Sequence, residues 1–93
     1  MSSYRIFETV EFVAGLGRLD SRSRRPIESK LKDLIYPQLR DQPHFGASIR
    51  KLQGYRPETW RVRLGRFRLF YTIDEQEHIV SILSIDHRKD AYR

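Results

Sequence analysis

The chain has 93 residues, enough for one domain spanning residues 1–93, and its lack of cysteine excludes disulfide bonds and thiolate metal sites. Eighteen Lys and Arg against twelve Asp and Glu give a net charge of +6 and a pI near 10.1, which favours a polyanionic partner. No stretch is long and apolar enough to span a membrane, and the N-terminus lacks the apolar segment of a signal peptide. We therefore expect a cytoplasmic protein with no membrane contact.

The first half of the chain predicts one strand followed by a helical hairpin. Residues 4–8 (YRIFE) have the imperfect alternation of a short strand. Apolar residues at helical spacing then indicate a first helix around residues 12–19 and a second whose apolar stripe spans residues 27–39, with Asp20 and Ser21 able to cap its start. Pro37 should end or bend the second helix at Tyr36. The apolar stripe of that helix consists of Ile27, Leu31, Leu34, Ile35 and Leu39.

A β-hairpin is predicted after a connector rich in Pro and Gly, in which residues 49–52 are the one ordered-looking piece. Residues 60–73 (WRVRLGRFRLFYTI) alternate Arg with apolar residues, which is the period of half-buried strands. Gly65 stands at the first central position that a type II′ turn requires. The facing pairs expected from this turn are Leu64 with Phe67, Val62 with Leu69, Trp60 with Tyr71, and Arg63 with Arg68.

The last strand completes the predicted fold. Residues 78–86 (HIVSILSID) are apolar on both faces, which is typical of a central strand. Only the N-terminal strand is left to flank it. We predict an α+β fold in which an N-terminal strand, a helical hairpin and a three-stranded antiparallel meander form a four-stranded sheet of order 1-4-3-2, with two helices on one face.

One face of the predicted hairpin carries Arg61, Arg63 and Arg68. Like charges opposed across two strands destabilise a hairpin unless an anion lies between them. Arginine suits phosphate because its planar fork donates two parallel hydrogen bonds. This face therefore predicts phosphate binding. The further basic residues that we expect to bind nucleic acid are Arg50, Lys51, Arg56, Arg66 and Lys89.

The C-terminal residues add groups that suit a nucleotide. His87, Arg88 and Tyr92 bring an imidazole, a phosphate-binding fork and a ring that can stack on a base within six residues. By contrast, the sequence has no ligand pair at helical spacing, no glycine-rich phosphate loop, and no Ser beside a fixed His and Asp. We therefore expect neither a metal nor another cofactor.

Three stretches together resemble the RelE/ParE superfamily of bacterial and archaeal type II toxins. They are KLQGY (51–55), WRVRLGRFRLFY (60–71) and SIDHRKDAY (84–92). The predicted elements match the fold of that superfamily over nearly the whole chain. For a RelE-type member, the resemblance implies a toxin that enters the ribosomal A site and cuts mRNA without metal, and a cognate antitoxin protein that blocks it.

The resemblance also implies roles for single residues. Arg61 and Arg63 match the two basic positions of the first hairpin strand, and Arg68 matches the phosphate-stabilising arginine of the second. Arg88 matches the basic residue after the last strand, and Tyr92 matches the C-terminal tyrosine that stacks on a base.

Metal-free RNA cleavage proceeds by attack of the 2′-hydroxyl on the adjacent phosphate, and Arg61, Arg63 and Arg68 would surround the resulting phosphorane. A guanidinium is a poor proton acceptor, so His87 is the candidate base. Two alternatives remain. One is a ParE-like poison of DNA gyrase without nuclease activity, for which His87 and Tyr92 would be expendable. The other is a non-catalytic nucleic-acid-binding domain.

Overall fold

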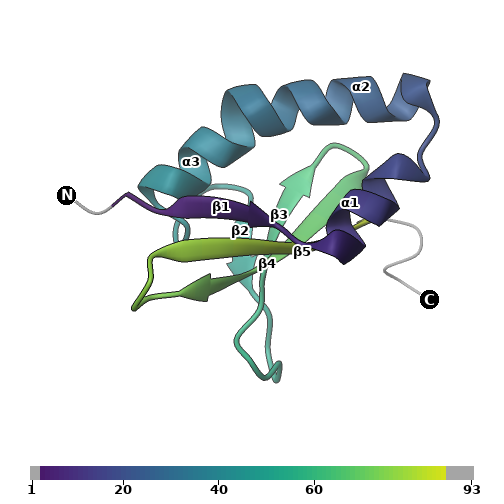
Figure 1. The fold of residues 1–93 in the computed structure, drawn as a ribbon. Coiled ribbons are helices and arrows are strands. Elements are labelled where there is room, and N and C mark those ends of the chain that lie inside the picture. The colour runs from purple at the N-terminus through teal and green to yellow at the C-terminus, as the bar shows by residue number, and fades with distance from the viewer. Residues whose placement is uncertain (1–2, 88–93) are drawn as a thin grey trace.

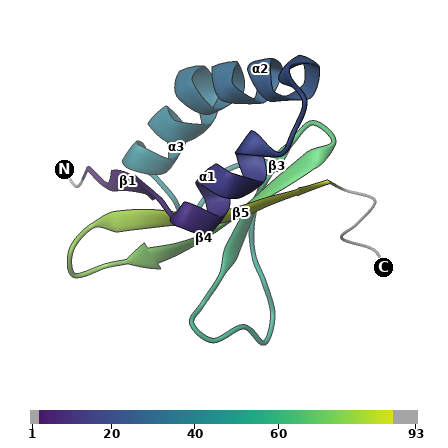
Figure 2. The ribbon, with the colours of Figure 1, turned by 45° about the vertical axis from the view of Figure 1, so that its right-hand side comes forward.

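The computed structural model describes residues 3–87, which form a five-stranded mixed sheet with helices covering one face (Figure 1; Figure 2). The strand order along the sheet is β1-β5-β4-β3-β2. In chain order the elements are β1 (Arg5–Glu8), α1 (Val10–Gly17), α2 (Ser21–Lys30), the π-helical turn η1 (Leu31–Ile35), α3 (Tyr36–Asp41), β2 (Ile49–Lys51), β3 (Trp60–Leu64), β4 (Phe67–Asp74) and β5 (Ile79–His87). Within residues 3–87 no helix is long and apolar enough to cross a membrane.

The predicted helical hairpin is present, and its second arm begins at the predicted cap, Asp20. Polar side chains cap both starts. The Thr9 hydroxyl accepts a hydrogen bond from the Phe12 N–H at 3.2 Å, and the Asp20 carboxylate accepts one from the Ser23 N–H at 2.8 Å. From there α2, η1 and α3 follow one another without a break over residues 21–41.

Pro37 bends this second arm but does not end it. Proline has no N–H, and its ring crowds the carbonyl four residues back. The turn before it is accordingly π-helical, with the Tyr36 N–H bonded to the Leu31 carbonyl, and the helix changes direction there before continuing to Asp41 (Figure 1). The wider turn also rotates the apolar stripe. Leu34, which the stripe was predicted to include, is therefore 63% exposed.

The hairpin of β3 and β4 has the predicted register, and all four facing pairs are present. Gly65 adopts a φ of +61°, whereas the φ of Arg66 is negative, as a type II′ turn requires. The last strand, β5, is flanked on both sides, because it pairs antiparallel with β4 and parallel with β1. The α+β class is thus confirmed.

The prediction of four strands is wrong, and the predicted order 1-4-3-2 is therefore incomplete. Residues 49–51 form a fifth strand, β2, which pairs antiparallel with β3 at the edge of the sheet. Ile49 lies opposite Val62, and Arg50 lies opposite Arg61. Three residues are too few to show an alternation in the sequence. Pairing with β3, rather than the local pattern, makes them a strand.

The core lies between the helices and the sheet. Its buried residues are Tyr4, Phe12, Ile27, Leu31, Leu39, Val62, Leu64, Leu69, Tyr71, Val80 and Ile82. The Tyr71 hydroxyl is buried as well and donates a hydrogen bond to the Pro43 carbonyl at 2.7 Å, and burial raises the pKa of Tyr71. Because alternate residues of β3 and β4 enter this core, the residues between them face away from the helices.

Candidate nucleic-acid interface

The sheet face turned away from the helices carries four arginines on three neighbouring strands. We call these residues, Arg50 of β2, Arg61 and Arg63 of β3, and Arg68 of β4, the arginine face. Arg50 lies directly opposite Arg61, and Arg63 lies directly opposite Arg68. The register of three strands, rather than the hairpin alone, thus gathers the cations into one surface.

The four arginines differ in exposure. Arg61 is buried, with 9% of its surface exposed, whereas Arg68 is half-buried and Arg50 and Arg63 are exposed. A cavity of about 250 Å³ is lined by Arg50, Arg61 and Arg63 together with the start of β2 and the loop before it. The Arg63 N–H holds this loop by a hydrogen bond to the Ser48 carbonyl at 3.1 Å. A buried guanidinium in the wall of a cationic cavity is positioned before an anion arrives.

Asp86 lies on the other side of Arg68, opposite it on β5. It is exposed, and its position in the register puts it on the face of Arg68. The opposed pair of Arg63 and Arg68 is thus flanked by an acidic side chain of the protein itself. The pair therefore does not by itself require a bound phosphate. The cations of the arginine face still outnumber this carboxylate four to one.

His87, the predicted base, does not share the arginine face. It lies opposite Phe67, and the two rings meet edge to face with centroids 5.1 Å apart. Phe67 packs against the core. Because successive strand residues point to opposite faces, His87 is on the helix side of the sheet and Asp86 is on the arginine side. The structure therefore does not bring His87 together with the arginines.

The remaining predicted residues are dispersed. Lys51 lies opposite Trp60, not on the face of Arg50, and its Nζ is 3.3 Å from Glu58 Oε2 and 6.0 Å from the centroid of the Trp60 ring. Arg56 is exposed in the loop before β3, and Arg66 is exposed in the hairpin turn. The residues that lie outside the described part of the chain are Arg88, Lys89 and Tyr92.

Phe70 shares the arginine face, although the sequence analysis did not single it out. It lies opposite Arg61 on β3 and opposite Ser84 on β5, and it is half-buried. The alternation of the hairpin contains the signal that could have found it. Leu69 and Tyr71 point inward, so the residue between them must point outward.

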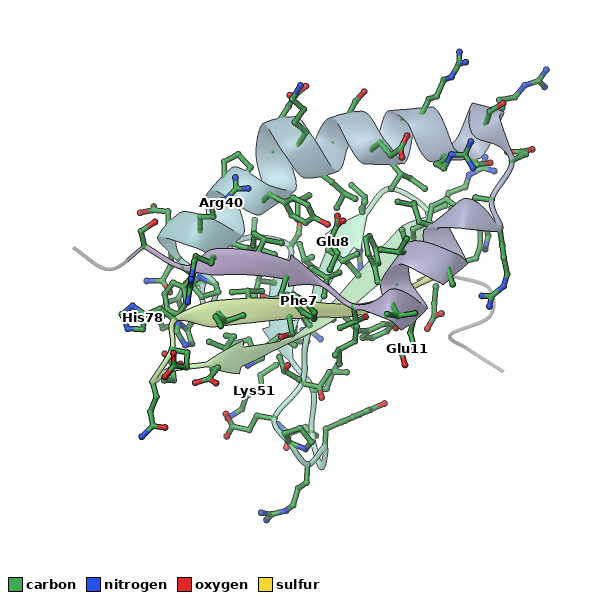
Figure 3. All side chains as sticks on the ribbon, viewed as in Figure 1. Phe7, Glu8, Glu11, Arg40, Lys51 and His78 are labelled. Atoms are coloured by element: carbon green, nitrogen blue, oxygen red, sulfur yellow. The ribbon has the colours of Figure 1, made fainter. Side chains whose placement is uncertain are left out.

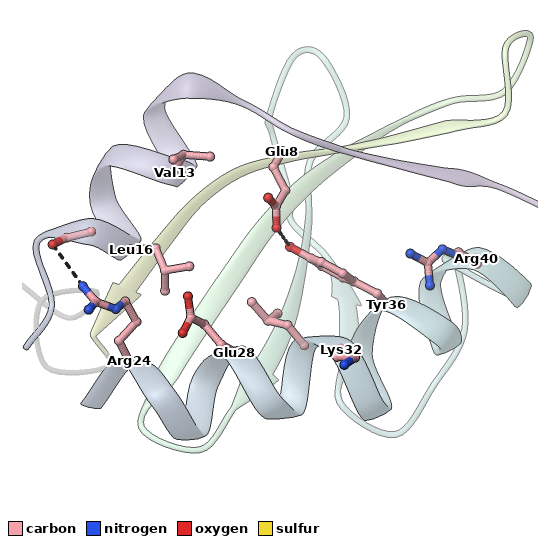
Figure 4. A pocket seen from close by; sticks show the side chains of 10 residues that line it. Glu8, Val13, Leu16, Arg24, Glu28, Lys32, Tyr36 and Arg40 are labelled. Carbon is pink, nitrogen blue, oxygen red and sulfur yellow. Dashed lines mark hydrogen bonds between the residues drawn. The ribbon is translucent and has the colours of Figure 1, made fainter. Parts of the chain in front are cut away.

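A larger cavity, of about 740 Å³, lies among α1, β1 and the long helical arm (Figure 4). Val13, Leu16 and Leu31 supply apolar lining, and the charged residues that line the cavity are Glu8, Arg24, Glu28, Lys32 and Arg40. The Tyr36 hydroxyl donates a hydrogen bond to Glu8 Oε2 at 2.6 Å. Burial, followed by this hydrogen bond, raises the pKa of Tyr36. We call this cavity the helix groove.

A titratable cluster joins three segments at the far end of β4. Glu75 accepts hydrogen bonds from His44 Nε2 at 2.5 Å and from the Tyr4 hydroxyl at 2.8 Å. The bond from His44, and then the bond from Tyr4, lower the pKa of Glu75. The Tyr4 ring stacks on His78 with centroids 4.9 Å apart, at the end of the sheet where Figure 3 labels His78. Among residues 3–87, no group of three or more His, Asp or Glu side chains is placed to hold a metal ion.

Several solved structures that this chain resembles are toxins and toxin–antitoxin complexes. The RelBE2 complex from Mycobacterium tuberculosis contains a chain that is 26% identical, with a TM-score of 0.72 and coverage of 95% of this chain and 94% of that one. The archaeal RelE–RelB complex from Pyrococcus horikoshii OT3 gives 24% identity, a TM-score of 0.64 and coverage of 92% and 96%. A chain of free RelE from Escherichia coli is 18% identical, with a TM-score of 0.68 and coverage of 97% of this chain and 88% of that one. The last two show a likeness of fold alone.

Sequence comparisons point the same way. Toxin RelG of Mycobacterium tuberculosis (strain ATCC 25618 / H37Rv) is 49% identical over 35 residues, which cover 38% of this chain and 40% of RelG. The model of the family described as "ParE toxin of type II toxin-antitoxin system, parDE" matches residues 6–92. The chain therefore belongs to the ParE toxin family of type II toxin–antitoxin systems, within the RelE/ParE superfamily that its motifs resemble.

Proposed function

We propose that this toxin is a metal-independent endoribonuclease that cleaves mRNA on the ribosome and thereby inhibits translation. The observation that carries the proposal is the arginine face, where four arginines lie on three adjacent strands, three of them line a cavity, and one of those three, Arg61, is buried. The fold shared with RelE toxins supports it. Because its substrate would be ribosome-bound mRNA, the proposal places the toxin in the cytoplasm.

The proposed reaction makes one bond and breaks one bond at phosphorus. The ribose 2′-oxygen attacks the adjacent phosphate as its proton passes to a base. The 5′-oxygen leaves as it takes up a proton, which yields a 2′,3′-cyclic phosphate and a 5′-hydroxyl end. Arg61, Arg63 and Arg68 would donate hydrogen bonds to the phosphorane, and preorganised donors of this kind contribute several kcal/mol.

The arginines cannot serve as the proton acceptor, because guanidinium stays protonated. Two titratable side chains at the end of β5 are the candidates, Asp86 on the arginine face and His87 on the helix side. Asp86→Asn and His87→Ala test them separately. The acceptor is the residue whose loss removes the acid limb from the pH profile of single-turnover cleavage.

We also propose a cognate antitoxin as the partner of this chain. The relatives from Mycobacterium tuberculosis and Pyrococcus horikoshii were solved as toxin–antitoxin complexes. A net charge of +6 suits an acidic or amphipathic covering segment. The arginine face and the helix groove both offer it a surface. Co-expression should relieve growth inhibition and yield a stable complex, and the absence of any small partner in a pull-down from the native host would count against the toxin–antitoxin assignment.

The family match favours one further candidate, a ParE-like poison of DNA gyrase without nuclease activity. The matching family model describes ParE toxins. The position of His87 away from the arginines also suits a protein that needs no imidazole base.

Induction of the chain in cells separates the two activities. Cleavage on the ribosome should produce new transcript 5′ ends inside codons and no DNA-damage response. Gyrase poisoning should produce double-strand breaks and leave transcript ends unchanged. Programmed ribosomes with purified toxin then test cleavage directly, and unchanged transcripts together with DNA breaks would refute the ribonuclease proposal.

A further inference from the structure

Phe70 is an aromatic residue that lies outside the hydrophobic core cluster. Its neighbours along β4, Leu69 and Tyr71, are completely buried on the helix side of the sheet. Phe70 therefore points to the opposite face. It is half-buried there, and it is not one of the partly buried hydrophobic residues that pack against the core. The ring belongs to the surface that carries the arginines.

The register surrounds this ring with cations. Arg61 lies directly opposite it on β3, and Arg68 lies two residues before it on the same face of β4, about 7 Å away along the strand. Ser84 lies opposite it on β5. The pairing of β4 with β5 shifts between Phe70 and Tyr71, and such irregularities re-aim side chains near functional sites.

An aromatic ring between guanidinium groups matches the chemistry of a single RNA strand. The charged backbone needs cations, and each base offers a flat face that stacks on an aromatic side chain. Open faces of antiparallel sheets normally carry polar residues. The core cluster therefore does not require a phenylalanine at this position, and contact with a nucleobase gives the ring a role.

We propose that Phe70 is a base-stacking residue, which holds the base of an mRNA nucleotide whose phosphate is bound by Arg61 and Arg68. The inference rests on the proposed ribonuclease function and adds a nucleobase subsite to it. The subsite selects for a flat ring rather than for a base identity, because every base has a stacking face.

The test compares toxin variants and messages in single-turnover cleavage on programmed ribosomes. The variants are wild type, Phe70→Leu, Phe70→Tyr and the control Phe45→Leu, which alters a Phe that is 73% exposed in the loop after α3. The messages carry either uridine or 5,6-dihydrouridine at each position of the A-site codon. Dihydrouridine keeps the pairing edge of uridine, but its saturated ring is not flat. Thermal melts confirm that each variant is folded.

Phe70→Leu should reduce cleavage of the uridine message about tenfold, the scale of one stacked base. Phe70→Tyr, which keeps a stacking ring, should lose much less activity than Phe70→Leu, and the control Phe45→Leu should cleave like wild type. For wild type, dihydrouridine at one codon position should cause the same loss, and combining it with Phe70→Leu should cause no further loss, because both changes remove one contact.

Two results would overturn the stacking role while leaving the proposed function intact. One is cleavage by Phe70→Leu at the wild-type rate. The other is a loss with Phe70→Leu that is equally large on every dihydrouridine message, which would mean that the ring acts through the fold. If wild type cleaves no message, the ribonuclease function itself fails, and the nucleobase subsite fails with it.

Discussion

The two ends of β4 carry charged groups that are arranged in opposite ways. Beyond its last residue, the Glu75 carboxylate accepts hydrogen bonds from His44 and Tyr4, so this acidic group has its donors within the chain. Near its first residue, Arg68 belongs to the arginine face, where the pairing of the described strands places Asp86 beside four cations. A carboxylate that accepts hydrogen bonds from other segments stabilises their packing against one another. An excess of one sign creates a field that attracts a polyanion.

The largest loss of function should follow the removal of a cation from the centre of the arginine face. Arg68→Ala should lower cleavage of ribosome-bound mRNA by on the order of a hundredfold or more, the scale of one deleted transition-state donor. Its stability should stay about level, because the substitution removes both the like-charge opposition to Arg63 and the opposite-charge pairing with Asp86. A thermal melt and a cleavage assay measure both effects.

The matched control is Arg25→Ala, which removes an exposed arginine of α2 on the other side of the molecule. It should cleave normally. Undiminished cleavage by folded Arg68→Ala would refute the assignment of this face to catalysis.

Arg63→Ala should have the next largest effect, because Arg63 is exposed and lines the cavity of the arginine face. We expect a loss of several-fold in affinity for a single-stranded RNA oligonucleotide at low salt. The slope of log affinity against log salt should fall by about 0.7, the value for one phosphate contact on a single strand. Fluorescence anisotropy at four salt concentrations measures the slope, and an unchanged slope would exclude Arg63 as a phosphate ligand.

Asp86→Asn should have the opposite effect and strengthen the binding of RNA to the arginine face. It removes the one carboxylate that the register places beside Arg68. Affinity for the same oligonucleotide should rise about two- to threefold, a modest change because exposed charges interact weakly through water. Glu77→Gln makes the same change of charge in the β4–β5 turn and should leave affinity unaffected. Equal gains from both variants would mean that net charge, not position, controls binding.

The smallest expected effect lies in the acid stability of the Glu75 cluster. Since the folded state lowers the pKa of Glu75 below its ordinary value of 4.5, the ionised carboxylate stabilises the fold above that value. The stabilisation should disappear as the pH falls through the lowered pKa. Glu75→Gln should therefore lose stability relative to wild type at pH 6 and approach it near pH 3, as measured by urea unfolding. A difference that is constant from pH 3 to pH 6 would contradict this role.

The hairpin was the part of the fold most open to prediction. Alternation along residues 60–73 and one glycine at the turn fixed both its register and its inward face, because side-chain direction in a strand repeats every two residues. The edge strand β2 was missed, since three residues acquire strand geometry only by pairing with β3. At Pro37 the sequence predicted an end or a bend, because the chemistry of proline allows both, and the π-helical turn makes it a bend.

The two-residue repeat of side-chain direction also made part of the candidate site predictable. Arg61, Arg63 and Arg68 follow from alternation within one hairpin, whereas the positions of Asp86 and His87 depend on a partner strand. Because β5 is apolar on both faces, its sequence does not show which residues face the helices. The irregular pairing beside Phe70 then shifts the register, so that Asp86 and not His87 reaches the arginine side.

The parallel pairing of β1 with β5 has a consequence for how the chain is made. Thr9, at the end of β1, bonds to the Ile82 carbonyl, 73 positions later in the sequence. During synthesis the first strand therefore waits without its partner until nearly all of the described chain has emerged. Contacts of such high sequence separation form slowly, because the intervening chain must be closed into a loop first. The sheet, and with it the row that joins Arg63, Arg68 and Asp86, is completed only when the last strand arrives.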